Sequence, residues 1–147
     1  CLQAIADLDD EVGDGSRSVP AVRRAIAILD SLDERRTLGY NGLLATLASS
    51  LDRQKRHRAA DTAYLRAIAS LDSSGNGETM DRAIVEHDLA VSLNDLGETA
   101  EAERLLHDVL VRIERSDPTA HLPSQPLIHY AQVAYFNGSI DSSQKFF

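Results

Sequence analysis

Two nearly identical segments decide the fold: RAIAILDS at residues 24–31 and RAIASLDS at residues 66–73. The second segment begins 42 residues after the first, and the same offset superimposes further apolar residues. These pairs are Leu47 with Leu89, Leu51 with Leu93, Ala60 with Ala102 and Ile68 with Leu110. Self-similarity at a fixed period of roughly 20–50 residues is typical of folds in which one small unit stacks repeatedly.

Apolar residues within each repeat recur at helical spacing. Leu43, Leu47 and Leu51 fall on one face of a helix, and so do Leu89 and Leu93. No stretch shows the strict alternation of a half-buried strand. We therefore predict an all-α fold, an α-α superhelix (solenoid) of tandem helix–turn–helix repeats. Helices are expected at about 2–12, 19–35, 38–54, 57–72, 79–96, 99–115 and 125–137, and from about 140 to the chain end.

Turn residues fall where these helices should end. Gly97 supplies a residue on which the chain can turn, and Thr99 can cap the helix that follows. Residues 73–77 and 116–118 have the composition of loops. The boundaries divide a single domain, residues 1–147, into a degenerate repeat and three further ones. The repeats span about 1–36, 37–78, 79–122 and 123–147, the last one truncated.

The repeats resemble the tetratricopeptide repeat (TPR) family, whose unit is helix A, a tight turn and helix B. The best copy of the family pattern is Leu89, Ala90, Leu93, Gly97, Ala102, Leu106 and Val109. The preceding copy is Leu47, Ala48, Leu51, Lys55, Ala60, Tyr64 and Ala67, in which Lys55 replaces the turn glycine. The period of 42 exceeds the usual ~34 of the family. It is similar to the long-repeat, kinesin-light-chain-like variety.

The resemblance implies a scaffold that binds proteins or peptides on a concave face lined by helix A. Carried over by register, that face comprises Ser49, Asp52, Arg53, His87, Val91, Asn94, Asp95, Gln132 and Tyr135. Ala45, Ile84, Ile128 and Phe136 lie beside them in the same register. The mixture of polar and apolar residues suits an extended peptide, although individual members could instead pack between helices. Family members that clamp C-terminal carboxylates place Lys, Arg and Asn on this face, whereas the corresponding positions here are Ala45, Ser49, His87, Val91, Ile128 and Gln132.

Composition excludes several classes of partner. The net charge is −8, from 15 basic and 23 acidic residues, so binding to nucleic acid is not expected. No apolar run reaches the ~18 residues of a membrane span, and no signal peptide is visible. The single cysteine, Cys1, precludes an internal disulfide and agrees with a cytoplasmic location. We expect the sequence to be a fragment of a longer protein, because it lacks an initial Met.

No catalytic, metal-binding or cofactor-binding motif is present. The five histidines lack the His-Glu-x-x-His spacing of a helical zinc site and are expected to be scattered over the surface. The acidic residues 9–14 do not continue into a calcium-binding loop. There is no nucleophile elbow and no phosphate-binding glycine loop. We therefore predict no catalytic residues, no metal, no cofactor and no enzymatic activity.

The basic run at residues 53–58 has two interpretations. It could dock an acidic or phosphorylated partner, or it could be a solvated turn whose cations favour the carbonyl end of the preceding helix. The expected function is that of a protein- or peptide-binding scaffold within a larger bacterial signalling or regulatory protein. The alternative is a homo-oligomerisation module, in which exposed terminal helices, including Phe146-Phe147, join copies into a homodimer.

Overall fold

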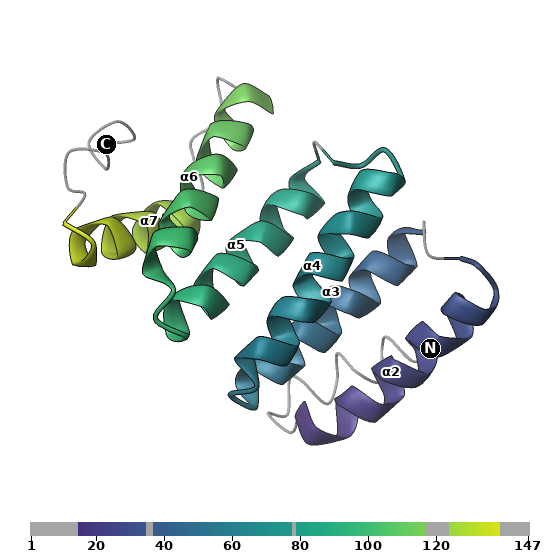
Figure 1. Ribbon diagram of the computed structural model, residues 1–147. Helices are drawn as coiled ribbons and strands as arrows, with labels where there is room; N and C mark the ends of the chain where they lie inside the picture. The colour runs from purple at the N-terminus through teal and green to yellow at the C-terminus, as the bar shows by residue number, and fades with distance from the viewer. Residues whose placement is uncertain (1–14, 35–36, 78, 117–123, 139–147) are drawn as a thin grey trace. The chain divides into compact units, whose positions relative to one another are not determined.

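The computed structural model describes residues 15–34, 37–77, 79–116 and 124–138. The chain divides into two compact units, Cys1–Gly77 and Glu78–Phe147 (units 1 and 2). The helices are α2 (Gly15–Ser31), α3 (Leu38–Arg53), α4 (His57–Ser73), α5 (Met80–Asp95), α6 (Thr99–Ser116) and α7 (Ser124–Phe136) (Figure 1). No strand occurs within the described ranges. The all-α prediction is confirmed.

Most predicted helix boundaries are confirmed to within two residues. α2 is the exception: it begins at Gly15 rather than near residue 19 and ends at Ser31 rather than near residue 35. It ends early because Asp33 adopts a left-handed φ of 57°, which a continuing helix does not allow. The helices expected at 2–12 and from 140 onward lie outside the described residues.

A shared hydrogen-bond pattern closes the tight turns inside the repeats. After α3, the Arg56 N–H donates to the Leu51 carbonyl at 2.9 Å, and the intervening Lys55 has a φ of 60°. After α5, the Glu98 N–H donates to the Leu93 carbonyl at 2.9 Å, around Gly97 at 84°. This is the Schellman arrangement, in which a left-handed residue satisfies the last carbonyls of a helix. Lys55 thus occupies the position that glycine takes in the next repeat.

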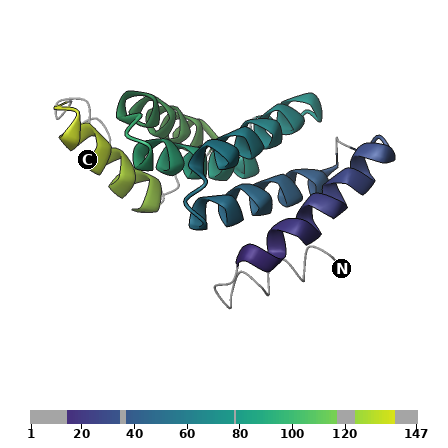
Figure 2. The ribbon, with the colours of Figure 1, turned by 60° about the horizontal axis from the view of Figure 1, so that its bottom comes forward.

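Unit 1 is a triplet in which α3 packs against both α2 and α4 (Figures 1 and 2). By the repeat register, α3 is a helix A, flanked by two helices B. Leu44 and Leu51 of α3 are almost fully buried, together with Val22 of α2 and Leu71 of α4. At the start of α3, the Thr37 hydroxyl accepts a hydrogen bond from the Tyr40 N–H at 3.2 Å and so caps the helix.

Unit 2 is the complementary triplet, in which α6, a helix B, packs against two helices A, α5 and α7. Leu106 and Leu110 of α6 form its centre together with Tyr130 of α7. α5 and α7 also contact one another directly, whereas α2 and α4 of unit 1 do not pack together. The middle helix is therefore a helix A in unit 1 and a helix B in unit 2.

A buried carboxylate lies in the core of unit 2. Glu86 is 4% exposed, and its Oε1 accepts a hydrogen bond from Arg82 Nε at 2.8 Å. Its Oε2 lies 3.3 Å from Arg112 Nη2 of α6, so this ion pair joins α5 to α6. Burying an ionised carboxylate is costly unless it is paired, which explains why two arginines surround it.

Candidate binding surfaces

The three predicted face residues of unit 1 lie in the second half of α3. Ser49 is half-buried and Arg53 is exposed. The Asp52 carboxylate lies 2.8 Å from His57 Nδ1 and accepts a longer hydrogen bond, of 3.4 Å, from the Tyr64 hydroxyl. Both partners belong to α4. Asp52 therefore holds helix A against helix B of its own repeat.

The predicted residues of unit 2 lie on α5 and α7. Val91 and Asn94 are half-buried, while Asp95 is exposed. On α7, Gln132 is exposed and Tyr135 is 68% exposed. The sixth residue is His87, which is half-buried and contacts His129 of α7.

His87 and His129 form a close pair between α5 and α7. His87 Nε2 lies 2.8 Å from His129 Nδ1, and the ring planes differ by 13°. The ring centroids are 4.9 Å apart, much further than the two nitrogens, so the rings meet through their edges rather than their faces. The prediction that the histidines are scattered is wrong for these two. The packing of one repeat on the next brings together residues that are far apart in the sequence.

Neighbouring groups favour one donor and one acceptor within the pair. His87 Nδ1 lies 3.1 Å from Asp88 Oδ1, which favours a proton on that nitrogen and leaves Nε2 as the acceptor of the His129 N–H. Burial, and secondly the neighbouring His87, lower the pKa of His129 below its ordinary value, while Asp88 opposes the shift. The geometry therefore fits a hydrogen bond from the His129 N–H to His87 Nε2.

A small apolar pocket lies beside the pair. Its volume is about 180 Å³, and α5, α6 and α7 all contribute to it. Its walls are Met80, Ala83, Ile84, His87, Val109, Ile113, Gln125 and Pro126. Met80 and Ile84 at its edge are about half exposed, as is Ile128 on α7. Aliphatic side chains of this kind around a pocket can receive an apolar side chain of another molecule.

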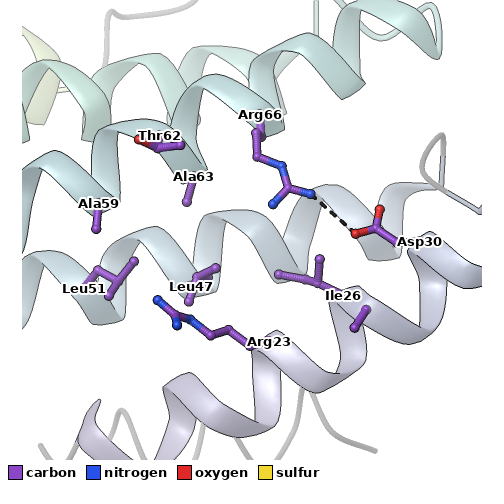
Figure 3. A pocket seen from close by; sticks show the side chains of 10 residues that line it. Arg23, Ile26, Asp30, Leu47, Leu51, Ala59, Thr62, Ala63 and Arg66 are labelled. Carbon is purple, nitrogen blue, oxygen red and sulfur yellow. Dashed lines mark ion pairs between the residues drawn. The ribbon is translucent and has the colours of Figure 1, made fainter.

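Unit 1 contains a larger groove of about 450 Å³, which lies between α2 and α4 over α3 (Figure 3). Its floor consists of Ile26, Leu47, Leu51 and Ala63, all nearly buried. Ala27, Ala59 and Thr62 are short side chains that leave the space open. Arg23 and Arg66 approach the groove from opposite sides (Figure 3).

A polar network closes one end of this groove. Arg66 Nη2 donates to the Tyr40 hydroxyl at 2.7 Å, and that hydroxyl donates to Asp30 Oδ1 at 3.0 Å. Arg66 also lies 3.6 Å from Asp30 Oδ2. Burial, followed by the hydrogen bond to Asp30, raises the pKa of Tyr40 above its ordinary value, so Tyr40 stays protonated and can donate. The network links α2, α3 and α4.

Neither a metal centre nor a membrane span is evident in the part of the chain that the structure describes. No three side chains of histidine, cysteine, aspartate or glutamate there are grouped as metal ligands. Among the same residues, no helix combines the length and the apolar character needed to cross a bilayer.

Known structures place the fold. No protein-family model and no curated protein matches the sequence. The chain is similar over 99% of its length to nearly identical TPR-like repeats of a Podosopora anserina protein described as a kinesin light chain. That match has 16% identity, a TM-score of 0.82 and covers 69% of the other chain. BtubC (BKLC) from P. vanneervenii matches over 99% of this chain and 58% of its own, with 15% identity and a TM-score of 0.88. The fold is TPR-like.

The TPR domain of Arabidopsis FLU supports the same assignment, with a TM-score of 0.70 and 15% identity over 78% of this chain and 92% of its own. The predicted α-solenoid of tandem repeats is thereby confirmed, as is the resemblance to the long-repeat variety. TPR-like folds commonly bind protein partners and generally act as non-catalytic scaffolds. At these identities the likeness describes the fold and not a partner.

Sequence reasoning missed the histidine pair and the groove of unit 1. His129 lies one position from Ile128, which register placed beside the predicted face, but no local motif connects it to His87. The groove depends on short side chains on two helices that are not neighbours in the sequence. The alanines at positions 27 and 63 were a usable signal, because small residues on facing helices leave room between them.

Proposed function

We propose that this TPR-like chain is a protein- or peptide-binding module whose contact surface is the helix-A side of unit 2. The observation that carries the proposal is the exposure of Met80 and Ile84 at the edge of an apolar pocket, to which α7, the helix of exposed Ile128, also contributes. Large aliphatic side chains gathered at a concave site mark a surface that another protein covers.

The predicted face residues give this surface its polar component. Asn94 and Gln132 carry amides that can bond to a peptide backbone, and Tyr135 offers a ring with a hydroxyl. The occupant that fits is a partner segment with one aliphatic side chain for the pocket and a backbone free to bond. His87, Val91 and Asp95 of α5 complete the proposed face of unit 2. Ser49, Asp52 and Arg53 of α3 are the corresponding proposed contacts in unit 1. In this proposal the four repeats act as one domain.

The decisive variant is Ile84→Asp, which places a charge at the pocket edge. Ile84 is 54% exposed, so the substitution leaves the core intact. Leu65→Asp is its matched control, because Leu65 is 56% exposed on α4 and does not line the pocket. Each variant is immobilised, and the proteins retained from native lysate are quantified by mass spectrometry.

We expect at least one protein to be retained by the wild type and by Leu65→Asp, and at least about tenfold less by Ile84→Asp. Identical retention by all three would contradict the proposed surface. Alanine at Asn94, Asp95 and Tyr135 should weaken the same capture without lowering Tm. We also propose, on the long-repeat resemblance alone, that the module works in the cytoplasm within a bacterial signalling or regulatory protein and catalyses nothing.

Self-association is a second candidate, favoured by two exposed aromatic residues on α7. Tyr135 and Phe136 are 68% and 78% exposed, and their rings meet edge to face at 5.7 Å. Phe146 and Phe147 lie outside the described residues. Light scattering over a concentration series tests this candidate: a dimer that Phe136→Ser dissociates supports it, and a monomer at every concentration contradicts it.

A further inference from the structure

The groove of unit 1 combines an apolar floor with cationic edges in a chain of net charge −8. Leu47 and Leu51 of α3 form the floor, between α2 and α4. Among the described residues, two arginines and one carboxylate, that of Asp30, line the groove. The local charge is thus opposite in sign to that of the whole chain, which favours an anionic occupant.

The two arginines differ in what they already bind. Arg66 is engaged with Tyr40 and Asp30 at the closed end. Arg23 is exposed and makes no hydrogen bond or ion pair within the described residues. In Figure 3 its guanidinium extends toward Leu47 and Leu51. A cation that lies over an apolar floor and has no partner among the described residues is suited to pair with a carboxylate that arrives with an aliphatic group.

The groove has the length of a short peptide. Its lining on α2 runs from Arg23 to Asp30, and its lining on α4 runs from Ala59 to Arg66. Seven residues of helix at 1.5 Å each span about 10 Å. Extended chain advances about 3.3 Å per residue, so about three residues fit along the groove. The floor has room for one aliphatic side chain among them.

We propose that the groove between α2 and α4 binds an acidic segment of a partner protein. One aliphatic side chain of that segment fills the space over Leu47 and Leu51, and a neighbouring carboxylate pairs with Arg23. This site goes beyond the function proposed above, because it lies in unit 1, on the helix-B side of the repeat, and has a different chemistry. The charge of Arg23 favours an acidic segment, and the apolar floor favours an aliphatic residue next to the acidic one.

The proposal is tested with an array of hexapeptides that each carry one central aliphatic residue between acidic residues. A matched neutral array replaces each Asp with Asn and each Glu with Gln, and a polar array replaces the aliphatic residues with Ser. Binding of labelled peptides to the full chain is measured by fluorescence polarisation at low and high salt. We expect acidic–aliphatic peptides to bind at least tenfold more tightly than both matched arrays, and more weakly as salt rises.

Charge reversal at adjacent arginines localises the binding. Arg23→Glu should weaken the best peptide by at least tenfold, since a charge-assisted hydrogen bond contributes about 1.5–3 kcal/mol and about 1.4 kcal/mol is tenfold. Arg24→Glu is the matched control: Arg24 is exposed on the same helix and does not line the groove, so affinity should change less than twofold. Circular dichroism tests whether both variants are folded. If Arg23→Glu is not folded, Arg23→Gln is used in its place.

A second pair of variants blocks the space instead of the charge. Ala27→Phe inserts a ring into the groove from an exposed position of α2 and should abolish peptide binding. Ala69→Phe makes the same change one repeat later on α4, outside the groove lining, and should have no effect.

Equal losses from Arg23→Glu and Arg24→Glu would overturn the proposal, because they would indicate attraction to any surface arginine. Failure of every acidic–aliphatic peptide to exceed its neutral control would overturn it too. The variant Ile84→Asp keeps the groove of unit 1, so it should retain peptide binding. Loss of capture at Ile84 and loss of peptide binding at Arg23 therefore report on separate surfaces.

Discussion

Units 1 and 2 are built from the same repeat, with helices in the order B-A-B in unit 1 and A-B-A in unit 2. They differ in what lies between their outer helices. In unit 1, α2 and α4 flank α3 and leave a groove of about 450 Å³. In unit 2, α5 and α7 approach each other, meet at the His87–His129 pair and leave a pocket of only about 180 Å³. The periodic apolar residues build the same core in both. The surfaces are set by side chains outside that pattern.

The offset of 42 pairs core positions whose chemistry differs between the units. Leu44 of α3 corresponds to Glu86 of α5, and Asn41 corresponds to Ala83. All four are buried. Each unit thus carries one polar side chain where the other has an apolar one, and substitutions that exchange them measure what each costs.

The largest effect is expected from Glu86→Leu, which gives unit 2 the residue that unit 1 has. Removing the carboxylate leaves Arg82 and Arg112 without their buried anion, and breaking such a pair costs about 3–5 kcal/mol. The free energy of unfolding, measured in urea, should fall by that amount. Ser70 is the residue that the offset of 42 aligns with Arg112. The double variant Glu86→Leu/Arg112→Ser should therefore recover most of the loss.

Glu101→Gln is the control for this experiment. Glu101 also pairs with an arginine, Arg104 at 2.6 Å, but both side chains are at least half exposed. An exposed pair contributes at most about 1 kcal/mol. A loss at Glu101 equal to that at Glu86 would show that burial is not the cause.

An intermediate effect is expected at the second pair of positions. Asn41 is 5% exposed, and neither its Nδ2 nor its Oδ1 has a hydrogen-bond partner within the described residues. A buried unsatisfied group costs about 1–3 kcal/mol. Asn41→Ala should therefore stabilise the chain by about 1 kcal/mol, measured as a higher urea midpoint, and Ala83→Asn should destabilise it. Destabilisation by Asn41→Ala would mean that this amide is bonded in solution.

A smaller effect separates the turns of the two repeats. Lys55 and Gly97 hold the same left-handed position, with φ values of 60° and 84°. That conformation costs a residue with a side chain about 1 kcal/mol relative to glycine. Lys55→Gly should raise the free energy of unfolding by about 1 kcal/mol, and Gly97→Ala should lower it by a similar amount. Opposite signs at the two turns are the decisive result in thermal melts.

The fold was predictable because its determinants are local and recur. Residues such as Leu47 and Leu89 mark the buried face of a helix in any context, and a fixed offset identifies the repeat. The end of α2 was predicted wrongly, because nothing in the composition near Asp33 required a left-handed turn there. The prediction that Lys55 replaces a turn glycine was confirmed, since the register fixed its position.

The binding surfaces were less predictable, because they depend on contacts between helices that are distant in sequence. Register placed Asp52 on the predicted face, yet its carboxylate is bonded to His57 and Tyr64 of its own repeat. His87 and His129 meet only after α5 and α7 have packed on α6. The role of the nine face residues in binding stays a prediction.

The smallest effect is expected from the pH dependence of the His87–His129 pair, a contact that unit 1 does not have. The pKa of His129 is lowered in the folded chain, mainly by burial and secondly by His87. Below about pH 6.5, His129 therefore binds a proton in the unfolded chain at a pH at which it is still unprotonated in the folded chain. The stability linked to His129 is fully present above that pH and falls as the pH falls toward its folded pKa. Urea titrations from pH 7.5 to pH 5, compared with His129→Gln, should show a shallower loss in the variant.

His107→Gln controls for the removal of an imidazole, since His107 lies outside the pair and its side chain is 39% exposed. Its pH profile should follow that of the wild type. Asp88 opposes the shift at His129, so Asp88→Asn should steepen the loss toward acid pH. If His129→Gln and the wild type lose stability in parallel, folding does not lower the pKa of His129. The approach of α5 to α7 would then leave the stability of unit 2 independent of the protonation of His129.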